Sequence, residues 1–150
     1  MDGRRTLPRL LAATLVLLAA CASSTPAAPG TSSPSTSPPG QTTQTNDGGQ
    51  VTVVVVWAGA SGGAVFDVKL DTHSVDLDAL DLSDAILRND RGETLPAQPW
   101  AAPKGGHHRE GTLTFEGDDA PFFAGTRWVE LVLSGVGDLP ERTLRWEVGS

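Results

Sequence analysis

The chain has little of several residue types, and each shortage excludes a class of structure. Its 150 residues include one cysteine, Cys21, and one methionine, Met1. A single cysteine leaves no pair for a disulfide within the chain, and the scarcity of thiol and thioether groups argues against a Cu(I) site. Apolar runs are short as well. The uncharged run at residues 10–20 has eleven residues, whereas a membrane-crossing helix needs about 20.

Positive charge is also scarce. The chain has 18 Asp and Glu against 11 Lys and Arg, which gives a formal net charge of −7. Three of the eleven cationic residues precede residue 10, so the acidic excess lies in the rest of the chain. An acidic surface repels phosphate backbones, so nucleic acid is excluded as a partner. The same surface favours metal cations or a basic protein partner.

The first 20 residues have the pattern of an export signal. Three arginines precede the apolar run of residues 10–20, and two alanines stand directly before Cys21. A positive flank, a short apolar core and small residues at the cleavage point predict a signal peptide over residues 1–20. An ordinary secretory signal with a chance cysteine is the alternative.

The tetrapeptide Leu18-Ala19-Ala20-Cys21 resembles the lipobox of bacterial lipoproteins. In that family the cysteine thiol is diacylglycerol-modified and becomes the new N-terminus. The resemblance implies lipidation at Cys21 and a lipid-anchored location at the cell membrane, facing outside the cytoplasm. Two or three acyl chains suffice for stable anchoring.

Residues 21–49 are predicted to be a disordered tether that carries the lipid on Cys21. Of the 28 residues after Cys21, 17 are Ser, Thr or Pro, and three alanines supply the only apolar side chains. Such a segment cannot bury enough surface to offset the entropy of ordering it. A flexible chain of this length spans roughly 30 Å, which suits a spacer between membrane and domain.

Residues 50–150 hold every tryptophan and phenylalanine of the chain and are predicted to form one domain. Segments of β-pattern alternate there with turn signals, and no helix is expected. The continuous β-branched segment 51–57 is expected to be buried on both faces. The fold predicted is all-β, an immunoglobulin-like β-sandwich of about seven strands, with a small closed barrel as the alternative. The predicted strands are 51–57, 65–71, 85–88, 93–98, 107–116, 129–133 and 144–148.

The three histidines stand beside predicted strand ends. His73 directly follows one strand, and His107 and His108 begin another. Strand ends of a sandwich can converge at one pole, where loops carry function. Imidazole with one carboxylate suits Cu(II) or Zn(II), so His73, His107, His108 and Asp71 are the predicted metal ligands. Neighbours on a strand point to opposite faces, so at most one of the adjacent histidines joins His73. Structural histidines that bond loop carbonyls are the alternative.

Two further chemistries compete with this site. Asp71, Asp76 and Asp78 offer carboxylates for Ca(II), but their spacing lacks the glycine and closing glutamate of an EF-hand. The segment 59–63 matches G-x-S-x-G with Ser61 as the nucleophile. That motif requires a helix after it, and an alternating strand follows here. We therefore predict a hairpin turn at Ser61 and no enzymatic activity.

Two segments, DTHSVDLD (71–78) and GGHHREGTLTF (105–115), resemble a group of bacterial exported and lipid-anchored β-domains with no assigned activity. The resemblance covers roughly residues 50–150 and implies structure but no mechanism. Gly106-His107, followed by a strand that ends at Phe115, is also similar to the Gly-His turn of CopC-like copper proteins, which are sandwiches. Gly105 stands where that family has Asp.

These patterns predict a lipid-anchored, extracytoplasmic binding or structural accessory module that binds Cu(II) or Zn(II) through its histidines. The alternative is a protein-interaction module, in which an acidic face binds a basic partner and the histidines are structural. A small hydrolase that uses Ser61 is the remote alternative.

Overall fold

The computed structural model describes Ser35–Thr36 and residues 42–148. The predicted signal peptide, Cys21 and most of the predicted tether lie outside these residues. Within the described part, no helix has the length and apolar character that crossing a membrane requires.

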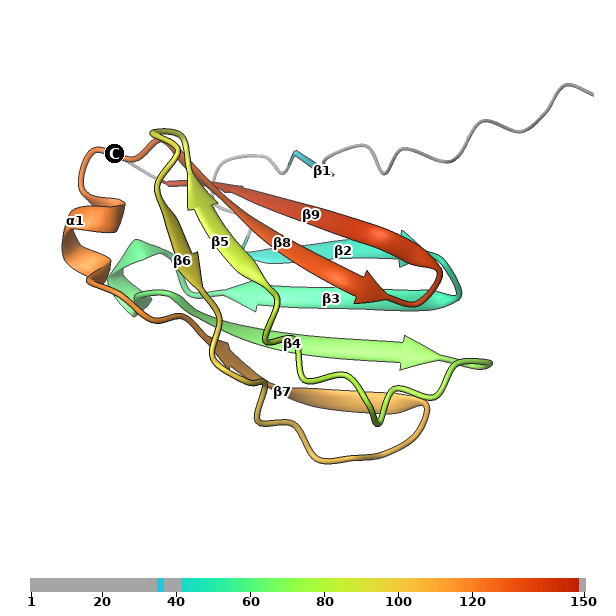
Figure 1. Cartoon of the computed structure of the whole chain (residues 1–150). Coiled ribbons are helices and arrows are strands. Elements are labelled where there is room, and N and C mark those ends of the chain that lie inside the picture. The colour runs from blue at the N-terminus through green and yellow to red at the C-terminus, as the bar shows by residue number, and fades with distance from the viewer. Residues whose placement is uncertain (1–34, 37–41, 149–150) are drawn as a thin grey trace, which may run out of the picture. The chain divides into compact units, whose positions relative to one another are not determined.

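Two sheets form the domain (Figure 1). The four-stranded sheet has the order β2 (Thr43–Gly48), β3 (Val51–Trp57), β4 (Val65–Thr72), β7 (His108–Thr114). The five-stranded sheet has the order β1 (Ser35–Thr36), β9 (Leu139–Glu147), β8 (Trp128–Val136), β5 (Ile86–Asn89), β6 (Thr94–Pro96). Only β1 pairs in parallel, with β9. The predicted all-β sandwich is confirmed, and each of the seven predicted strands corresponds to one of β3–β9.

The domain begins earlier than the sequence predicted. β2 lies within the residues expected to be tether, and it pairs with β3 along its whole length. Gln44 and Asn46 are its buried side chains. Because both are polar, β2 lacks the apolar alternation from which a strand is recognised. The predicted tether boundary at residue 49 is therefore wrong for β2.

Arg142 fastens β2 to the opposite sheet. Its side chain is fully buried, and it donates to Asn46 Oδ1 at 2.7 Å, Gly48 O at 2.6 Å and Val136 O at 3.2 Å. Burial lowers the pKa of the Arg142 guanidinium. A buried cation is tolerated only when its donors are satisfied. The bonds to Asn46 and Gly48 therefore stabilise the packing of β2 against the opposite sheet.

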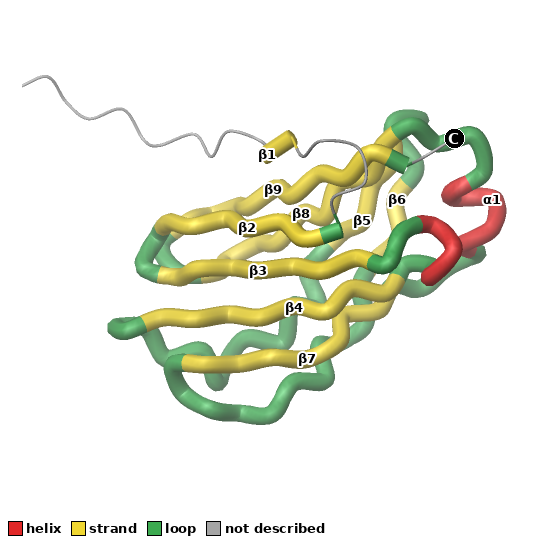
Figure 2. The backbone as a smooth tube through the Cα atoms, turned by 180° about the vertical axis from the view of Figure 1, so that it is seen from behind, coloured by secondary structure: helices red, strands yellow, loops and turns green. Residues whose placement is uncertain are grey.

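The core lies between the two sheets. Along β3, Val51, Val53, Val55 and Trp57 face inward and are buried. The expectation that this strand is buried on both faces is wrong, because Val56 on the other side is 38% exposed. Figure 2 shows the reason: no described element lies over the outer face of β2, β3, β4 and β7.

Aromatic side chains close one end of the core. Trp57 stacks on Phe66 and Phe123, with ring centroids at 5.7 and 5.6 Å, and Trp146 lies 5.4 Å from Phe66. Phe123 belongs to α1 (Asp119–Phe123), a five-residue helix that the sequence did not predict. Asp118 caps α1 by accepting a hydrogen bond from Ala120 N. Five residues are too few to show the 3.6-residue apolar periodicity from which a helix is recognised in a sequence.

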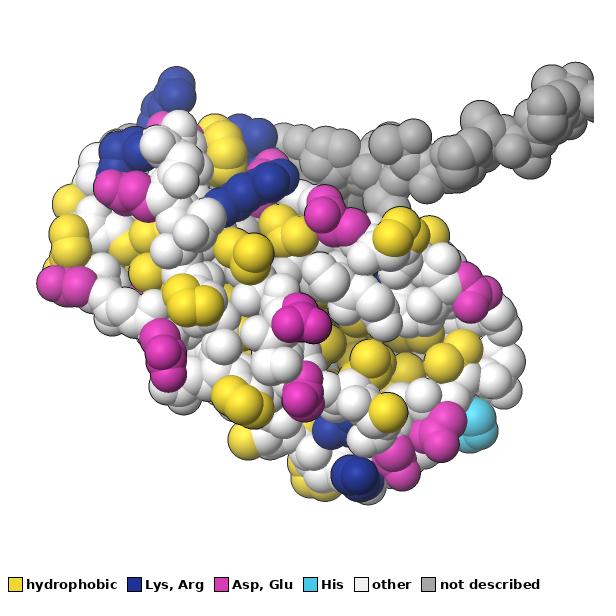
Figure 3. All heavy atoms as spheres, in the orientation of Figure 1, with side chains coloured by type: hydrophobic (Ala, Val, Ile, Leu, Met, Phe, Trp, Pro, Cys, Tyr) yellow, Lys and Arg dark blue, Asp and Glu magenta, His cyan; other side chains and the backbone are white. Residues whose placement is uncertain are grey.

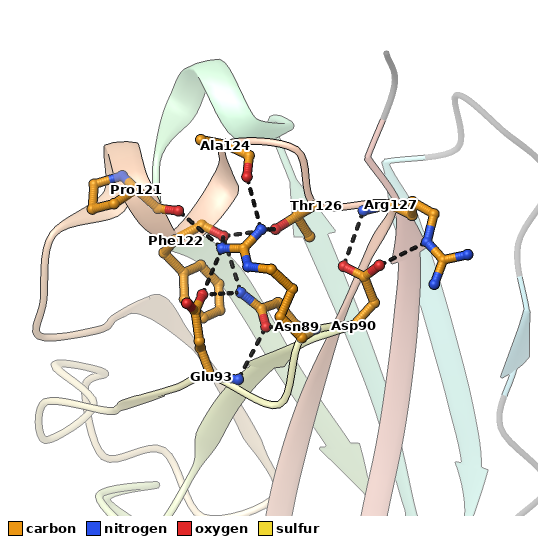
Figure 4. A network of polar contacts seen from close by, with 9 residues as sticks. Asn89, Asp90, Glu93, Pro121, Phe122, Ala124, Thr126 and Arg127 are labelled. Atoms are coloured by element: carbon orange, nitrogen blue, oxygen red, sulfur yellow. Dashed lines mark hydrogen bonds and ion pairs between the residues drawn. The ribbon is translucent and has the colours of Figure 1, made fainter.

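The β5–β6 hairpin holds α1 in place through a polar network (Figure 4). Asn89 Nδ2 donates to Phe122 O at 3.0 Å and to Glu93 Oε2 at 2.7 Å. Arg91 donates to Ala124 O at 2.7 Å, and its hydrogen bond to Glu93 lowers the pKa of that carboxyl. The turn predicted at residues 89–92 is confirmed, and its side chains seal this end of the sandwich.

The β8–β9 connection is shorter than predicted. β8 continues to Val136 and β9 begins at Leu139, so only two residues join them. Gly137 has φ +65, and a Cβ there would lie 2.2 Å from Gly49 O. Only glycine permits both the left-handed backbone and this close approach. The β2–β3 and β8–β9 turns are thereby packed backbone to backbone.

Candidate functional site at the histidine pole

The three histidines lie at one end of the four-stranded sheet, as predicted. β4 ends at Thr72 and β7 begins at His108, and the two strands are antiparallel neighbours. Their register puts Asp71 opposite His108, so the residues after β4 and before β7 come together. We call this end of the sheet the histidine pole; it also contains the β2–β3 turn. In Figure 3 a histidine lies beside acidic side chains at the lower right edge.

Asp71 and His108 form the closest contact of the predicted metal ligands. His108 Nδ1 lies 2.7 Å from Asp71 Oδ1, and Lys69 Nζ lies 3.2 Å from Asp71 Oδ2. The hydrogen bond from His108, followed by that from Lys69, lowers the pKa of the Asp71 carboxyl. An ionised carboxylate only accepts, so His108 Nδ1 carries the proton and Nε2 is the nitrogen left for other ligands.

The other two histidines take separate roles. His107 Nδ1 lies 3.0 Å from Val75 O, which is the contact expected of a structural histidine. His73 is exposed and lines a depression beside Asp71. Across residues 42–148 there is no cluster of three or more His, Cys, Asp or Glu side chains arranged to hold a metal ion.

The depression, which we call the acidic hollow, has a volume of about 320 Å³. It follows from strand register: Asp47 of β2 lies opposite Thr52 of β3, and Thr52 lies opposite Asp71 of β4. Residues paired in this way share one face of a sheet. The short Thr52 side chain therefore sits between two carboxylates. The lining residues are Asp47, Gln50, Thr52, Asp71, Thr72, His73 and Ser74.

Hydrogen bonds fix the walls of the acidic hollow. Thr52 Oγ1 donates to Asp47 Oδ1 at 2.8 Å, Ser74 Oγ donates to Gln50 Oε1 at 2.6 Å, and Thr72 Oγ1 donates to Gln50 O at 2.6 Å. Gln50 itself has a left-handed φ of 66°. Thr72 and Ser74 are thus bonded to Gln50, and Thr52 is bonded to Asp47. A ligand would meet the carboxylate of Asp47 and that of Asp71, whose two oxygens already contact His108 and Lys69.

The acidic crossover after His73 serves local structure. Asp78 Oδ1 accepts hydrogen bonds from Gly106 N and Gly105 N, both at 2.9 Å, and the bond from Gly106 is the main reason that the pKa of Asp78 is lowered. Asp76 Oδ1 accepts from Asp78 N at 2.9 Å. The carboxylates of Asp71, Asp76 and Asp78 each meet a different donor, so the structure does not gather these three predicted Ca(II) ligands.

Arg109 holds the pole together, although it was not among the residues predicted to form the site. It is 5% exposed and donates to Leu77 O at 2.7 Å, Ala102 O at 2.9 Å, Pro103 O at 3.1 Å and Leu80 O. Its guanidinium carbon lies 4.8 Å from the centre of the Trp100 ring. A signal was present: the alternation that turns Leu113 and Phe115 inward also turns residue 109 inward.

Ser61 lies at the other end of β4. The 3-10 helix η1 (Ala60–Gly62) joins β3 to β4, so the G-x-S-x-G segment forms the predicted turn between antiparallel strands. β4 has eight residues, so about 25 Å separate Ser61 from the histidine pole. The structure does not bring Ser61 to His107.

The fold and this site define a β-sandwich with an acidic hollow at one end of an uncovered sheet face. No protein-family model, curated protein or solved structure matches the chain.

Proposed function

We propose that the chain is a lipid-anchored, extracytoplasmic binding module that takes a cationic ligand at the acidic hollow. The observation that carries the binding role is the pair of carboxylates, Asp47 and Asp71, on either side of Thr52. Two carboxylates on one face of a sheet favour a cation between them. The anchoring role rests on Leu18-Ala19-Ala20-Cys21.

The anchor is tested with Cys21→Ala in a bacterial host. The unmodified chain should incorporate labelled fatty acid and partition into the detergent phase, because acyl chains bury many methylenes. Cys21→Ala should lose the label and move to the aqueous phase, whereas the matched control Ser23→Ala should behave like the unmodified chain. Detergent partitioning that survives in Cys21→Ala contradicts the anchor.

The binding role is tested by titrating the full mature chain, in detergent micelles, with a short lysine oligomer at low ionic strength. Amide shifts in NMR spectra should concentrate on residues 47–52 and 71–74. Because long-range attraction is screened by salt, the same titration at high salt separates local binding from general attraction. Shifts spread evenly over the acidic residues of both ends, including Glu93 and Glu116, contradict a defined site.

A divalent metal is the second candidate ligand, and the Asp71–His108 hydrogen bond favours it. Metal-ligating histidines usually donate their second ring N–H to a carboxylate, which orients the ring. His108 has this arrangement at 2.7 Å, and His73 lies two residues beyond Asp71 in the chain. Cu(II) and Zn(II) are the predicted metals because both bind imidazole. Ca(II), which binds oxygen ligands only, serves as the comparison.

Calorimetric titration with each metal tests this candidate. His108→Ala and His73→Ala should each abolish the heat of Cu(II) or Zn(II) binding. His107→Ala should leave it intact, because His107 is bonded to Val75 O. Equal heats in all three variants, or no heat in the unmodified chain, contradict a histidine metal site.

A further inference from the structure

We infer that the outer face of the four-stranded sheet is a docking surface for a protein partner, which inserts one Lys or Arg side chain into the acidic hollow. The inference rests on the proposed cation-binding role and names the kind of ligand and the surface around it.

No described element lies over the outer face of the sheet (Figure 2). Nearest the pole, Asp47, Thr52, Asp71 and His108 form one row across β2, β3, β4 and β7. Further from the pole the face mixes valine, threonine and charged side chains. Val56 and Val65 are among the few large apolar side chains of residues 42–148 that are prominently exposed, at 38% and 41%. The remaining outward residues of this part are Thr43, Thr45, Val54, Asp67, Lys69, Glu110, Thr112 and Thr114.

The row near the pole has the spacing for an organic cation. Neighbouring strands lie about 4.8 Å apart, so the backbones of Asp47 and Asp71 are separated by about 10 Å, with Thr52 between them. An ammonium or guanidinium group has donors on several sides and sits about 2.8 Å from each carboxylate oxygen. Such a group, placed over the short Thr52 side chain, would reach Asp47 and would take the place of Lys69 Nζ, which lies 3.2 Å from Asp71 Oδ2.

The charge of the whole domain favours the same occupant. Residues 42–148 contain 17 Asp and Glu and 8 Lys and Arg. Two of the eight cations, Arg109 and Arg142, are buried on backbone carbonyls and contribute little to the surface. Among the described residues of the outer face, Asp67 and Glu110 lie beside Lys69, which pairs with Asp71 at 3.2 Å. Four carboxylates thus face one lysine in this part of the structure. A partner with a basic patch is therefore steered towards this face.

The apolar part of the face distinguishes a protein from a free small cation. A polar anchor beside exposed aliphatic side chains is the composition of a protein–protein interface. A free cation would use the hollow alone and gain nothing from Val56 or Val65. The preformed walls of the hollow, in which Thr72, Ser74 and Gln50 are already bonded to one another, reduce the ordering that binding requires.

The experiment uses a pair of capped peptides, Ac-Thr-Val-Arg-Val-Thr-NH2 and the same peptide with citrulline in place of arginine. Citrulline keeps the shape of arginine and lacks its charge. Each is titrated into the full mature chain in detergent micelles, and the dissociation constant is taken from NMR amide shifts. The arginine peptide should bind about tenfold or more tightly than the citrulline peptide, which is the effect of charge-assisted hydrogen bonds. Its shifts should extend from the hollow to Val56.

Variants of the chain test where the arginine side chain of the peptide binds. Asp47→Asn and Asp71→Asn should each weaken binding about tenfold, and the matched control Asp84→Asn, which removes one acid from the crossover, should change it by less than about twofold. Thr52→Lys should fill the hollow from within and abolish binding while the fold remains intact. It therefore tests the hollow even where an aspartate variant proves unstable.

Three outcomes overturn the inference. One is equal binding of the arginine and citrulline peptides, and another is an effect of Asp84→Asn as large as that of Asp47→Asn. The third is confinement of the shifts to the hollow, which points to a free cation as the ligand. In each case the lysine-oligomer titration separately reports whether the proposed cation-binding role stands.

Discussion

Replacing Arg109 by methionine tests how the histidine pole is built. The variant keeps the length of the side chain and removes donors to four backbone carbonyls. The bond to Leu77 O is buried, and leaving a buried acceptor unpaired costs about 1–3 kcal/mol. The other three acceptors are partly reached by water, and each lost bond adds about 0.5–1.5 kcal/mol. The expected loss in the free energy of unfolding is therefore about 2.5–7.5 kcal/mol.

That loss is large for a domain of this size, whose total stability is about 5–15 kcal/mol. Urea denaturation of residues 22–150 without lipid, followed by tryptophan fluorescence, measures it. Amide exchange should also accelerate in residues 77–80 and 101–106, which Arg109 pins together. The matched control is Arg127→Met. Arg127 is 79% exposed and pairs with Asp90 at 2.7 Å, whereas Asp90 is 7% exposed. Asp90 keeps its hydrogen bond from Arg127 N at 3.1 Å in this variant, so the loss should be about 1 kcal/mol. An Arg109→Met variant within 1 kcal/mol of the unmodified chain, or no more affected than this control, refutes the reasoning.

Three further changes probe other parts of the structure. Arg142→Met should cost about 3 kcal/mol or more, because buried oxygens lose their donor; a urea midpoint near that of the unmodified chain contradicts this. Gly137→Ala should cost about 2–4 kcal/mol, since its Cβ would lie 2.2 Å from Gly49 O. Gly92 also has a left-handed φ, +81, but has free space around it, so Gly92→Ala is the matched control and should cost only about 1–2 kcal/mol. Similar thermal midpoints for the two variants would contradict a clash at residue 137. The pKa of the Asp71 carboxyl lies below its ordinary value of 3.8 because its histidine partner donates to it. Its contribution to stability is therefore present above that pH and lost as the pH falls through the lowered pKa. The stability difference between the unmodified chain and Asp71→Asn should accordingly shrink as the pH falls below 3.8 and vanish in strong acid; a difference that grows over this range contradicts the assignment.

The sequence predicted most strands because their buried residues are apolar. Val51, Val53 and Val55 alternate with outward residues in β3, and period-two alternation is the signature of a strand with one covered face. β2 has the same alternation in burial, but its inward residues are Gln44 and Asn46. The residues that satisfy them, Arg145 and Arg142, lie about a hundred positions further along the chain, so no local pattern marks β2 as a strand.

Part of the candidate site depends on β2, which the sequence did not predict. Asp71 and His73 of the acidic hollow were recognised because they stand beside a predicted strand end. Asp47 and Thr52 enter the site only through the pairing of β2, β3 and β4. The adjacent histidines separated as the geometry of an extended chain requires: His108 bonds Asp71, and His107 turns to Val75 O.

The sequence alone determined the fold class and the clustering of the histidines, because alternation and turn residues act between near neighbours. Tertiary structure alone decided which side chains meet. Strand register placed Asp47 beside Thr52 and Asp71, and buried guanidinium groups fastened the loops and the edge strand. Register is fixed by how two sheets fill a common core, and a buried arginine is stable only once distant carbonyls surround it. Both conditions exist only after the chain has folded.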